Sequence, residues 1–132
     1  QIHFIGAVSD DEKWPLYQRA TLFVLTSYSE NFGIVVLEAM AAGCPIIVTR
    51  EVGAAEIVRE SRAGRIVDGE PENLAKEIKE MLEDKTELEA ARNSGLRAVK
   101  ERYTWDSVAQ KMVQSIYLPS IEKSNARAYP HG

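Results

Sequence analysis

Two acidic side chains flank a glycine in the stretch SYSENFGIVVLEAMAAGCPII, residues 27–47. Glu30 precedes Asn31–Phe32–Gly33, and Glu38 follows inside an apolar run. Carboxylates repel phosphate but accept hydrogen bonds from hydroxyl groups. The free N–H groups at a helix start attract anions, and a glycine there leaves space for a ligand. Two acids around an anion site suit a ligand with hydroxyls at both ends and phosphates between them, which is the layout of a nucleotide-sugar.

A helix over residues 32–42 must position these groups. Ile34, Leu37, Glu38 and Ala41 lie along one side at helical spacing, and Asn31 is the expected N-cap. The rise of a helix then places Glu38 roughly 7–8 Å beyond Gly33. The predicted site therefore has an acid before the helix, backbone N–H groups at its start and a second acid further along it.

The surrounding pattern alternates apolar strands with helices. Strands are predicted at 2–6, 22–26, 46–49 and 65–67, and helices at 9–20, 32–42, 54–61, from about 71, at 86–101 and at 104–117. Ser9 can cap the first helix, although Pro15 leaves only 15–19 as its firmest part. Such alternation predicts an α/β, Rossmann-like parallel sheet with helices on both faces. Ligands of these sheets bind at the carboxyl ends of the strands, where residues 27–33 lie.

Composition excludes several functional classes. The 132 residues include 16 basic and 20 acidic side chains, for a net charge of −4, and they are dispersed, which argues against nucleic-acid binding. The single Cys44 suits a reducing compartment, so a cytoplasmic location is expected. With only His3 and His131 besides it, a zinc site is not expected, and no cofactor is indicated.

The motif and its surroundings resemble a known family. Glu30–Asn31–Phe32–Gly33 followed by Glu38–Ala39–Met40–Ala41–Ala42–Gly43–Cys44–Pro45 is similar to the E-x(7)-E region of family 4 glycosyltransferases, which have the GT-B fold. The likeness continues through residues 49–58, 63–78 and 102–117. It implies that residues 1–119 are part of the C-terminal, donor-binding domain, with 120–132 a loose tail.

The resemblance implies roles for individual residues. Glu30 would contact the donor sugar and be the catalytic residue, and Glu38 would bind the ribose hydroxyls. The turn between them would offer backbone groups to the sugar and phosphates; its donor-binding residues are Asn31, Phe32, Gly33 and Ile34. The reaction implied is transfer of a sugar from a nucleoside diphosphate to a hydroxyl acceptor, with retention and without a metal.

The chain departs from the family pattern in three ways. Val52–Gly53 stands where the family has Gly-Gly. Two strands carrying a basic Arg and Lys for the diphosphate are not found, nor is the acceptor-binding N-terminal domain. We therefore expect a part of a longer protein that is inactive alone. Without those strands, the predicted strand at 2–6 leaves an open edge, so dimerisation by strand pairing is a further hypothesis.

Other interpretations remain open at this point. The chain could be a non-catalytic nucleotide-sugar-binding module, a GT-B sugar epimerase or a purely structural domain. Glu30 and Glu38 could be ordinary solvated acids, Glu56 a first-turn acid, and Cys44 a packed residue. A membrane-bound acceptor is compatible with the family, but no residue here indicates one.

Overall fold

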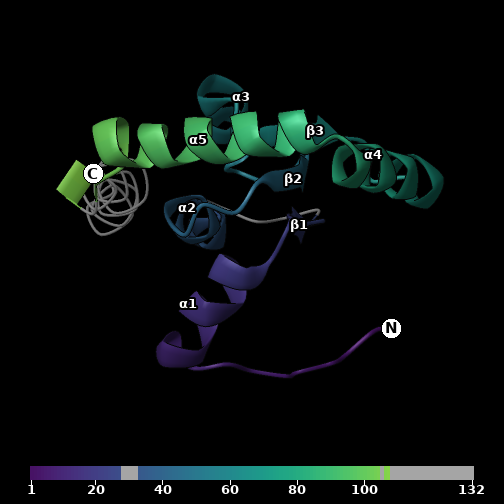
Figure 1. The fold of residues 1–132 in the computed structure, drawn as a ribbon, viewed down its shortest axis with the longest axis horizontal. Helices are drawn as coiled ribbons and strands as arrows, with labels where there is room; N and C mark the ends of the chain where they lie inside the picture. The colour runs from purple at the N-terminus through teal and green to yellow at the C-terminus, as the bar shows by residue number, and fades with distance from the viewer. Residues whose placement is uncertain (28–32, 105, 108–132) are drawn as a thin grey trace, which may run out of the picture. The chain divides into compact units, whose positions relative to one another are not determined.

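Parallel strands alternate with helices in the part of the chain that the structure describes. The computed structural model describes residues 1–27, 33–104 and 106–107, and the chain divides into two units, Gln1–Val99 and Lys100–Gly132. The elements, drawn in Figure 1, are α1 (Asp10–Arg19), β1 (Phe23–Leu25), α2 (Ile34–Ala41), β2 (Ile46–Thr49), α3 (Ala55–Ser61), β3 (Gly64–Val67), α4 (Pro71–Glu83) and α5 (Lys85–Arg102).

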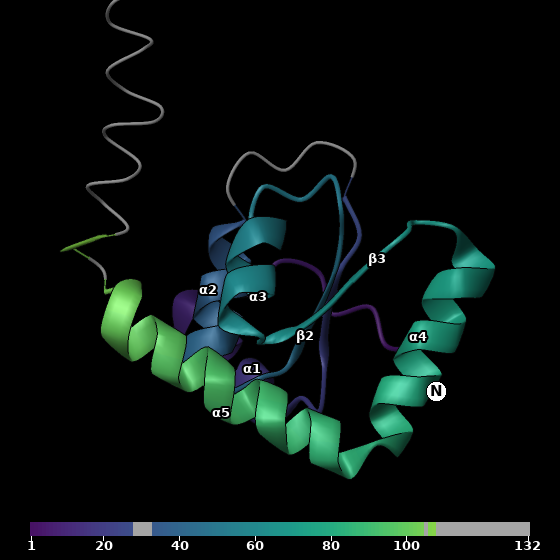
Figure 2. The same cartoon turned by 90° about the horizontal axis from the view of Figure 1, so that it is seen from above.

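The sheet has the order β1-β2-β3, and both pairings are parallel. Figure 2 shows α2 and α3 on one face of the sheet and α4 on the other. The central strand β2 is buried along its whole length, as expected of a parallel strand covered on both faces, whereas β1 and most of β3 are partly buried. The predicted parallel sheet with helices on both faces is therefore confirmed.

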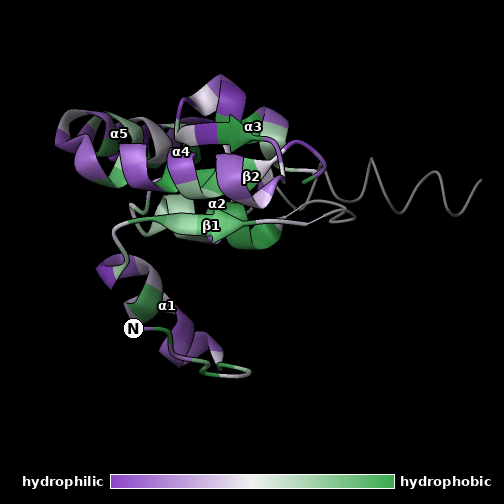
Figure 3. Cartoon of the chain, turned by 90° about the vertical axis from the view of Figure 1, so that its right-hand side faces the viewer, coloured by the Kyte–Doolittle hydropathy of each residue, from purple (hydrophilic) through white to green (hydrophobic). Residues whose placement is uncertain are grey.

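Each face of the sheet packs its own apolar core. Side chains alternate along a strand, so Ile47 and Val67 point to the α4 face, where they form a buried cluster with Met81 and Ala91. On α2, Val36 and Met40 are completely buried. Figure 3 shows the apolar colouring of β1 and α2 against the largely hydrophilic outer turns of α4 and α5. No helix of the described residues is long and apolar enough to cross a membrane.

Gly64 is required where β3 begins. It pairs with Ile46, and a Cβ atom at Gly64 would lie 1.7 Å from the carbonyl oxygen of Ile46. No side chain fits at that distance, so only glycine lets these two strands pair here. The preceding helix, α3, ends at Ser61, close to its predicted end, and its C-cap Arg62 adopts a left-handed conformation with φ 55°.

The prediction of a strand at residues 2–6 is wrong. These residues pair with no other strand in the described part of the chain, and Ile2, Phe4 and Ile5 are 81%, 98% and 61% exposed. An apolar run becomes a strand only when a neighbouring strand supplies hydrogen-bond partners. In the described sheet, whose order is β1-β2-β3, no strand pairs with this segment.

Helix α1 starts earlier than Pro15 suggested. Ser9 is its N-cap as predicted, and the Glu12 carboxylate accepts hydrogen bonds from the Ser9 backbone N–H and hydroxyl, both at 2.9 Å. This contact holds the first turn, so α1 begins at Asp10 although Pro15 lies inside it. The predicted helix at 104–117 and the tail at 120–132 lie largely or wholly outside the described residues, as does the 119/120 boundary.

Candidate functional site

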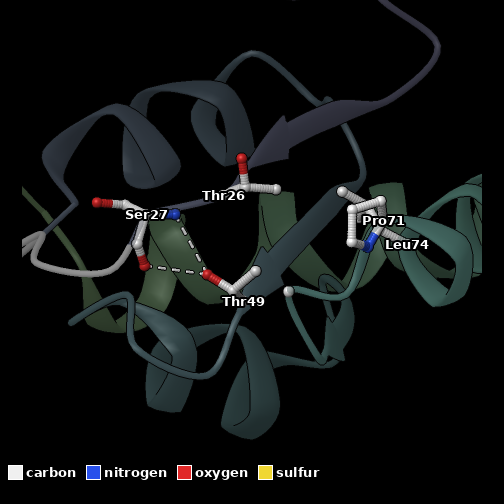
Figure 4. Close-up of a pocket in the computed structure, with 6 residues that line it drawn as sticks. Thr26, Ser27, Thr49, Pro71 and Leu74 are labelled. Atoms are coloured by element: carbon white, nitrogen blue, oxygen red, sulfur yellow. Dashed lines mark hydrogen bonds between the residues drawn. The ribbon is translucent and has the colours of Figure 1, made fainter.

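The carboxyl ends of the three strands meet beside a cavity. Its volume is about 240 Å³. The residues that line it come from the ends of β1 and β2, from the loop before α4 and from the first turn of α4: Thr26, Ser27, Thr49, Gly69, Pro71 and Leu74. Figure 4 shows how they face one another. The cavity therefore lies at the edge of the sheet where the sequence placed a ligand site.

Thr49 connects the ends of β1 and β2. Its Oγ1 accepts a hydrogen bond from the Ser27 backbone N–H at 3.2 Å and donates one to the Ser27 carbonyl at 3.1 Å (Figure 4). The Thr49 residue is only 3% exposed, so water does not compete for these bonds. The chain enters the predicted site loop directly after Ser27, and Thr49 therefore fixes one end of that loop.

Gly33 fixes the other end of the loop. It is the N-cap of α2, in a left-handed conformation with φ 64°, and its carbonyl accepts from the Val36 N–H at 2.8 Å. The predicted Asn31 cap was therefore wrong, because α2 begins at Ile34. The first N–H groups of α2 still have no acceptor inside the helix, so this end keeps the positive dipole end expected of an anion site.

The reason for a glycine at position 33 differs from the expected one. A Cβ atom there would lie 3.0 Å from the Ala54 Cβ and 3.4 Å from the Val52 Cγ1. The space beside Gly33 is thus filled by the loop between β2 and α3, and the left-handed φ independently favours glycine. Packing and backbone conformation account for this residue before any ligand is considered.

Glu38 lies on α2 and is buried, with 7% of the residue exposed. Its Oε1 accepts a hydrogen bond from Lys13 Nζ at 2.9 Å, and its Oε2 accepts one from the Tyr17 hydroxyl at 3.2 Å. Both partners come from α1. The carboxylate that the sequence assigned to ribose therefore also links the two helices.

The environment of this carboxylate keeps its partners in fixed protonation states. Lys13 Nζ also contacts the Asp10 carboxylate at 2.8 Å, and hydrogen bonds to Asp10 and Glu38 raise the pKa of Lys13. Burial, followed by the nearby negative charge of Glu38, raises the pKa of Tyr17. Near neutral pH the pair therefore presents an ammonium and a neutral phenol to Glu38, and both are donors.

Three of the predicted site residues, Glu30, Asn31 and Phe32, lie outside the described residues. Gly33 and Ile34 start α2, and Glu38 lies further along the same helix. The structure therefore brings Gly33 and Ile34 to the edge that carries the cavity, whereas it joins Glu38 to α1.

The loop between β2 and α3 carries the Val52–Gly53 departure. Val52 is 2% exposed and packs toward the space beside Gly33, so its side chain closes that side of the turn. Glu56 lies in the first turn of α3 and forms an ion pair with Arg59 while both side chains remain largely exposed. This is the position expected of a dipole-stabilising acid.

Sequence reasoning missed Lys13, Tyr17 and Thr49. The first two stand four residues apart on a predicted helix, a spacing that puts side chains on one face. Nothing in the sequence, however, says that this face meets Glu38. Thr49 had a clearer signal, since it is the polar residue that ends an apolar strand at the ligand-binding edge.

Comparison with known proteins identifies the family. The sequence model described as "Glycosyl transferases group 1" matches residues 1–98. The chain belongs to this family. It is 34% identical, over 92% of its length, to an uncharacterized glycosyltransferase of Methanocaldococcus jannaschii, of which it covers 31%. It is 31% identical, over 99% of its length, to a D-inositol 3-phosphate glycosyltransferase of Corynebacterium urealyticum, again covering 31%.

Solved structures of glycosyltransferases share the fold. Sucrose-phosphate synthase from Thermosynechococcus elongatus superposes with a TM-score of 0.72 and 28% identity over 96% of the chain, and the chain covers 31% of that protein. WaaG, a glycosyltransferase involved in lipopolysaccharide biosynthesis, gives a TM-score of 0.70 over 86% of the chain. These likenesses confirm the predicted GT-B fold class. The chain thus spans less than a third of the length of these family members.

Proposed function

We propose that the chain is the donor-binding part of a GT-B glycosyltransferase that moves a sugar from a nucleoside diphosphate to a hydroxyl acceptor. The observation that carries the proposal is the meeting of the α2 start, at Gly33, with the carboxyl ends of β1 and β2 in a chain of this family. Helix N–H groups at that edge suit a diphosphate, and the two acids of the motif suit the hydroxyls on either side.

The mechanism that follows is stabilisation of the leaving group. Negative charge grows on the diphosphate as the bond to the sugar breaks. N–H groups at the start of α2 stabilise that charge more strongly in the transition state than in the ground state. Glu30 would hold the sugar and act as the catalytic residue, and Glu38 would hold the ribose. Asn31, Phe32, Gly33 and Ile34 would supply donor-binding backbone groups. Retention and independence of metal remain part of this proposal.

Other parts of the enzyme would come from segments beyond these 132 residues. The relatives are more than three times as long as the stretch that matches them, which supports a separate acceptor-binding domain and further phosphate ligands. We therefore expect the isolated chain to bind a donor without transferring its sugar. Sugar transfer catalysed by the purified chain would overturn this expectation.

The decisive experiment is a titration of the chain with nucleotide-sugars. UDP-glucose, GDP-mannose and ADP-glucose would each be followed by amide NMR shifts and calorimetry. Saturable binding of one of them, weakened by Glu38→Ala but not by Glu89→Ala on the exposed face of α5, is the expected result. A chain that binds none of them would be a structural domain, and the proposal would fail.

Kinetics would then test the catalytic assignment in a full-length enzyme that contains the chain. Glu30→Ala should lower kcat strongly, whereas Glu38→Ala should mainly raise KM for the donor. Wild-type kinetics in both variants would remove the two assignments. Product analysis separates transfer from epimerisation, and binding without any product would indicate a non-catalytic module.

Two finer statements belong to the same proposal. The free thiol of Cys44 supports a reducing, cytoplasmic setting. The outer position of β1 in the described sheet supports pairing with a strand from a second copy or from another segment. A single monomeric species in light scattering across a wide concentration range would argue against pairing between copies.

A further inference from the structure

Glu38 is held by two side chains from a different helix, and this contact has a consequence for ligand binding. We propose that Lys13 and Tyr17 are positioning residues for the donor, because they orient the Glu38 carboxylate so that it accepts hydrogen bonds from ribose hydroxyls. This inference rests on the proposed function, since it assumes that Glu38 faces the ribose.

The geometry of α1 brings both donors to one carboxylate. Lys13 and Tyr17 are four residues apart and share a face of α1. The Tyr17 ring packs edge-on against Trp14 and Phe23, with centroid distances of 6.1 and 5.6 Å. These contacts fix the ring, so its hydroxyl reaches Glu38 from a constant direction.

The hydrogen-bonding capacity of Glu38 leaves room for two hydroxyl groups. An ionised carboxylate offers about four acceptor positions, two on each oxygen. Lys13 occupies one position on Oε1 and Tyr17 occupies one on Oε2. One position then remains on each oxygen, which matches the adjacent 2′ and 3′ hydroxyls of a ribose. Without its two donors the carboxylate could rotate, and this match would be lost.

The charge of Lys13 adds a second effect. An unpaired carboxylate on the helix that binds the diphosphate would repel it. The ammonium group lies 2.9 Å from Glu38 and 2.8 Å from Asp10, so it offsets negative charge near the site. Lys13 is thus expected to favour a diphosphate ligand as well as to orient the carboxylate.

A purely structural role predicts a different outcome from a positioning role. If Lys13 and Tyr17 only hold α1 against α2, removing their side chains lowers stability and weakens the binding of all nucleotides to the same extent. If they orient Glu38, their loss selectively weakens ligands that carry both ribose hydroxyls. The ratio of the Kd for a 2′-deoxy nucleoside diphosphate to that for its ribose counterpart separates the two roles.

The test measures this ratio for the 132-residue chain with UDP, GDP and ADP and their 2′-deoxy forms. Wild type should prefer the ribose form by roughly ten- to a hundredfold, the contribution of one hydrogen bond to a charged group. Tyr17→Phe keeps the packed ring, removes only the hydroxyl and should bring the ratio within about twofold of one. Lys13→Met should do the same, and Lys13→Arg should restore the preference.

Two further variants complete the design. Glu38→Met removes both acceptor oxygens and should abolish the ribose preference directly. Ser9→Ala weakens the start of α1 without touching Glu38, and it should leave the ratio unchanged even if the melting temperature falls.

The outcomes separate this inference from the proposed function. If wild type binds none of the nucleotides, the proposed donor site itself fails. If it binds without ribose preference, or if Glu38→Met keeps the preference, Glu38 does not bind the ribose and the inference falls with that assignment. If Glu38→Met loses the preference but Tyr17→Phe and Lys13→Met keep it, the donor site stands and the positioning role is overturned. An equal loss of ribose preference in Ser9→Ala would also overturn the positioning role. It would show that the preference depends on the stability of α1 and not on the two side chains that contact Glu38.

Discussion

Replacing Thr49 by valine removes one hydroxyl group from the carboxyl end of β2 and leaves the shape of the side chain almost unchanged. That hydroxyl makes two hydrogen bonds to the backbone of Ser27, at 3.2 and 3.1 Å, in a residue that is 3% exposed. We expect Thr49→Val to destabilise the chain and to weaken nucleotide binding, because Ser27 lies just before the predicted donor-binding residues in the chain. Thr49→Ser keeps the hydroxyl and is the matched control.

The size of the effect follows from these two bonds. Each contributes roughly 0.5–1.5 kcal/mol, and the buried backbone groups that lose a partner bring the total toward the upper end. The extra methyl group of valine returns at most about 0.8 kcal/mol. The net loss is then about 1–2 kcal/mol in the free energy of unfolding. For a chain of this length, 2 kcal/mol corresponds to a fall in Tm of roughly 6–10 °C.

Urea denaturation gives the stability change, and amide hydrogen exchange shows whether it is local to Ser27. Exchange at Ser27 should accelerate more than at β2 positions such as Ile47, whose ladder bonds are unaffected. Titration with the nucleotide that wild type binds best reports on the site. The reasoning is refuted if Thr49→Val lies within about 0.5 kcal/mol of wild type with unchanged nucleotide affinity.

Three further predictions concern the scaffold. Gly64→Ala should unfold the chain or displace β3, because its Cβ would meet the Ile46 carbonyl at 1.7 Å; circular dichroism and urea denaturation measure this. Burial raises the pKa of Cys44 to about 11, so native protein should react with iodoacetamide at pH 8 far more slowly than unfolded protein. Arg65→Met should cost about 1–3 kcal/mol of stability, less in 1 M salt, because Arg65 holds a group of carboxylates that includes Glu87, at 2.5 Å; urea titrations at two ionic strengths test this.

A specific result would contradict each of these three predictions. Wild-type stability in Gly64→Ala would mean that the strands do not pair as described. Between pH 9 and 11 the unfolded thiol of Cys44 loses its proton while the folded one keeps it. Stability should therefore fall as pH rises there by up to about 2–3 kcal/mol more in wild type than in Cys44→Ala. Equal pH slopes would contradict the burial of the thiol. If Arg65→Met lowers the free energy of unfolding equally at both ionic strengths, Arg65 stabilises the chain through packing and not through its charge.

Local pattern predicted most of the elements. Apolar runs four or five residues long became β1 and β2; β2 is buried along its whole length and β1 is partly buried. Pro71 and the apolar stripe after it became α4. The predicted strand at 2–6 did not form, although its sequence is also rich in apolar residues. It contains three large apolar residues, but strand formation depends on a neighbouring strand that local sequence does not show.

The amino-acid sequence alone identified the family, through the E-x(7)-E motif and the alternation of strands and helices. It also determined the edge of the sheet at which a ligand should bind, because periodicity and chain order are properties of local sequence. Tertiary structure decided what each polar group touches. Only the packing of α1 on α2 joins Lys13 and Tyr17 to Glu38, and only the folded chain brings Ala54 against Gly33. These contacts link residues 21 to 25 positions apart in sequence, so no local pattern encodes them; they arise when apolar faces pack and bring distant side chains within hydrogen-bonding distance.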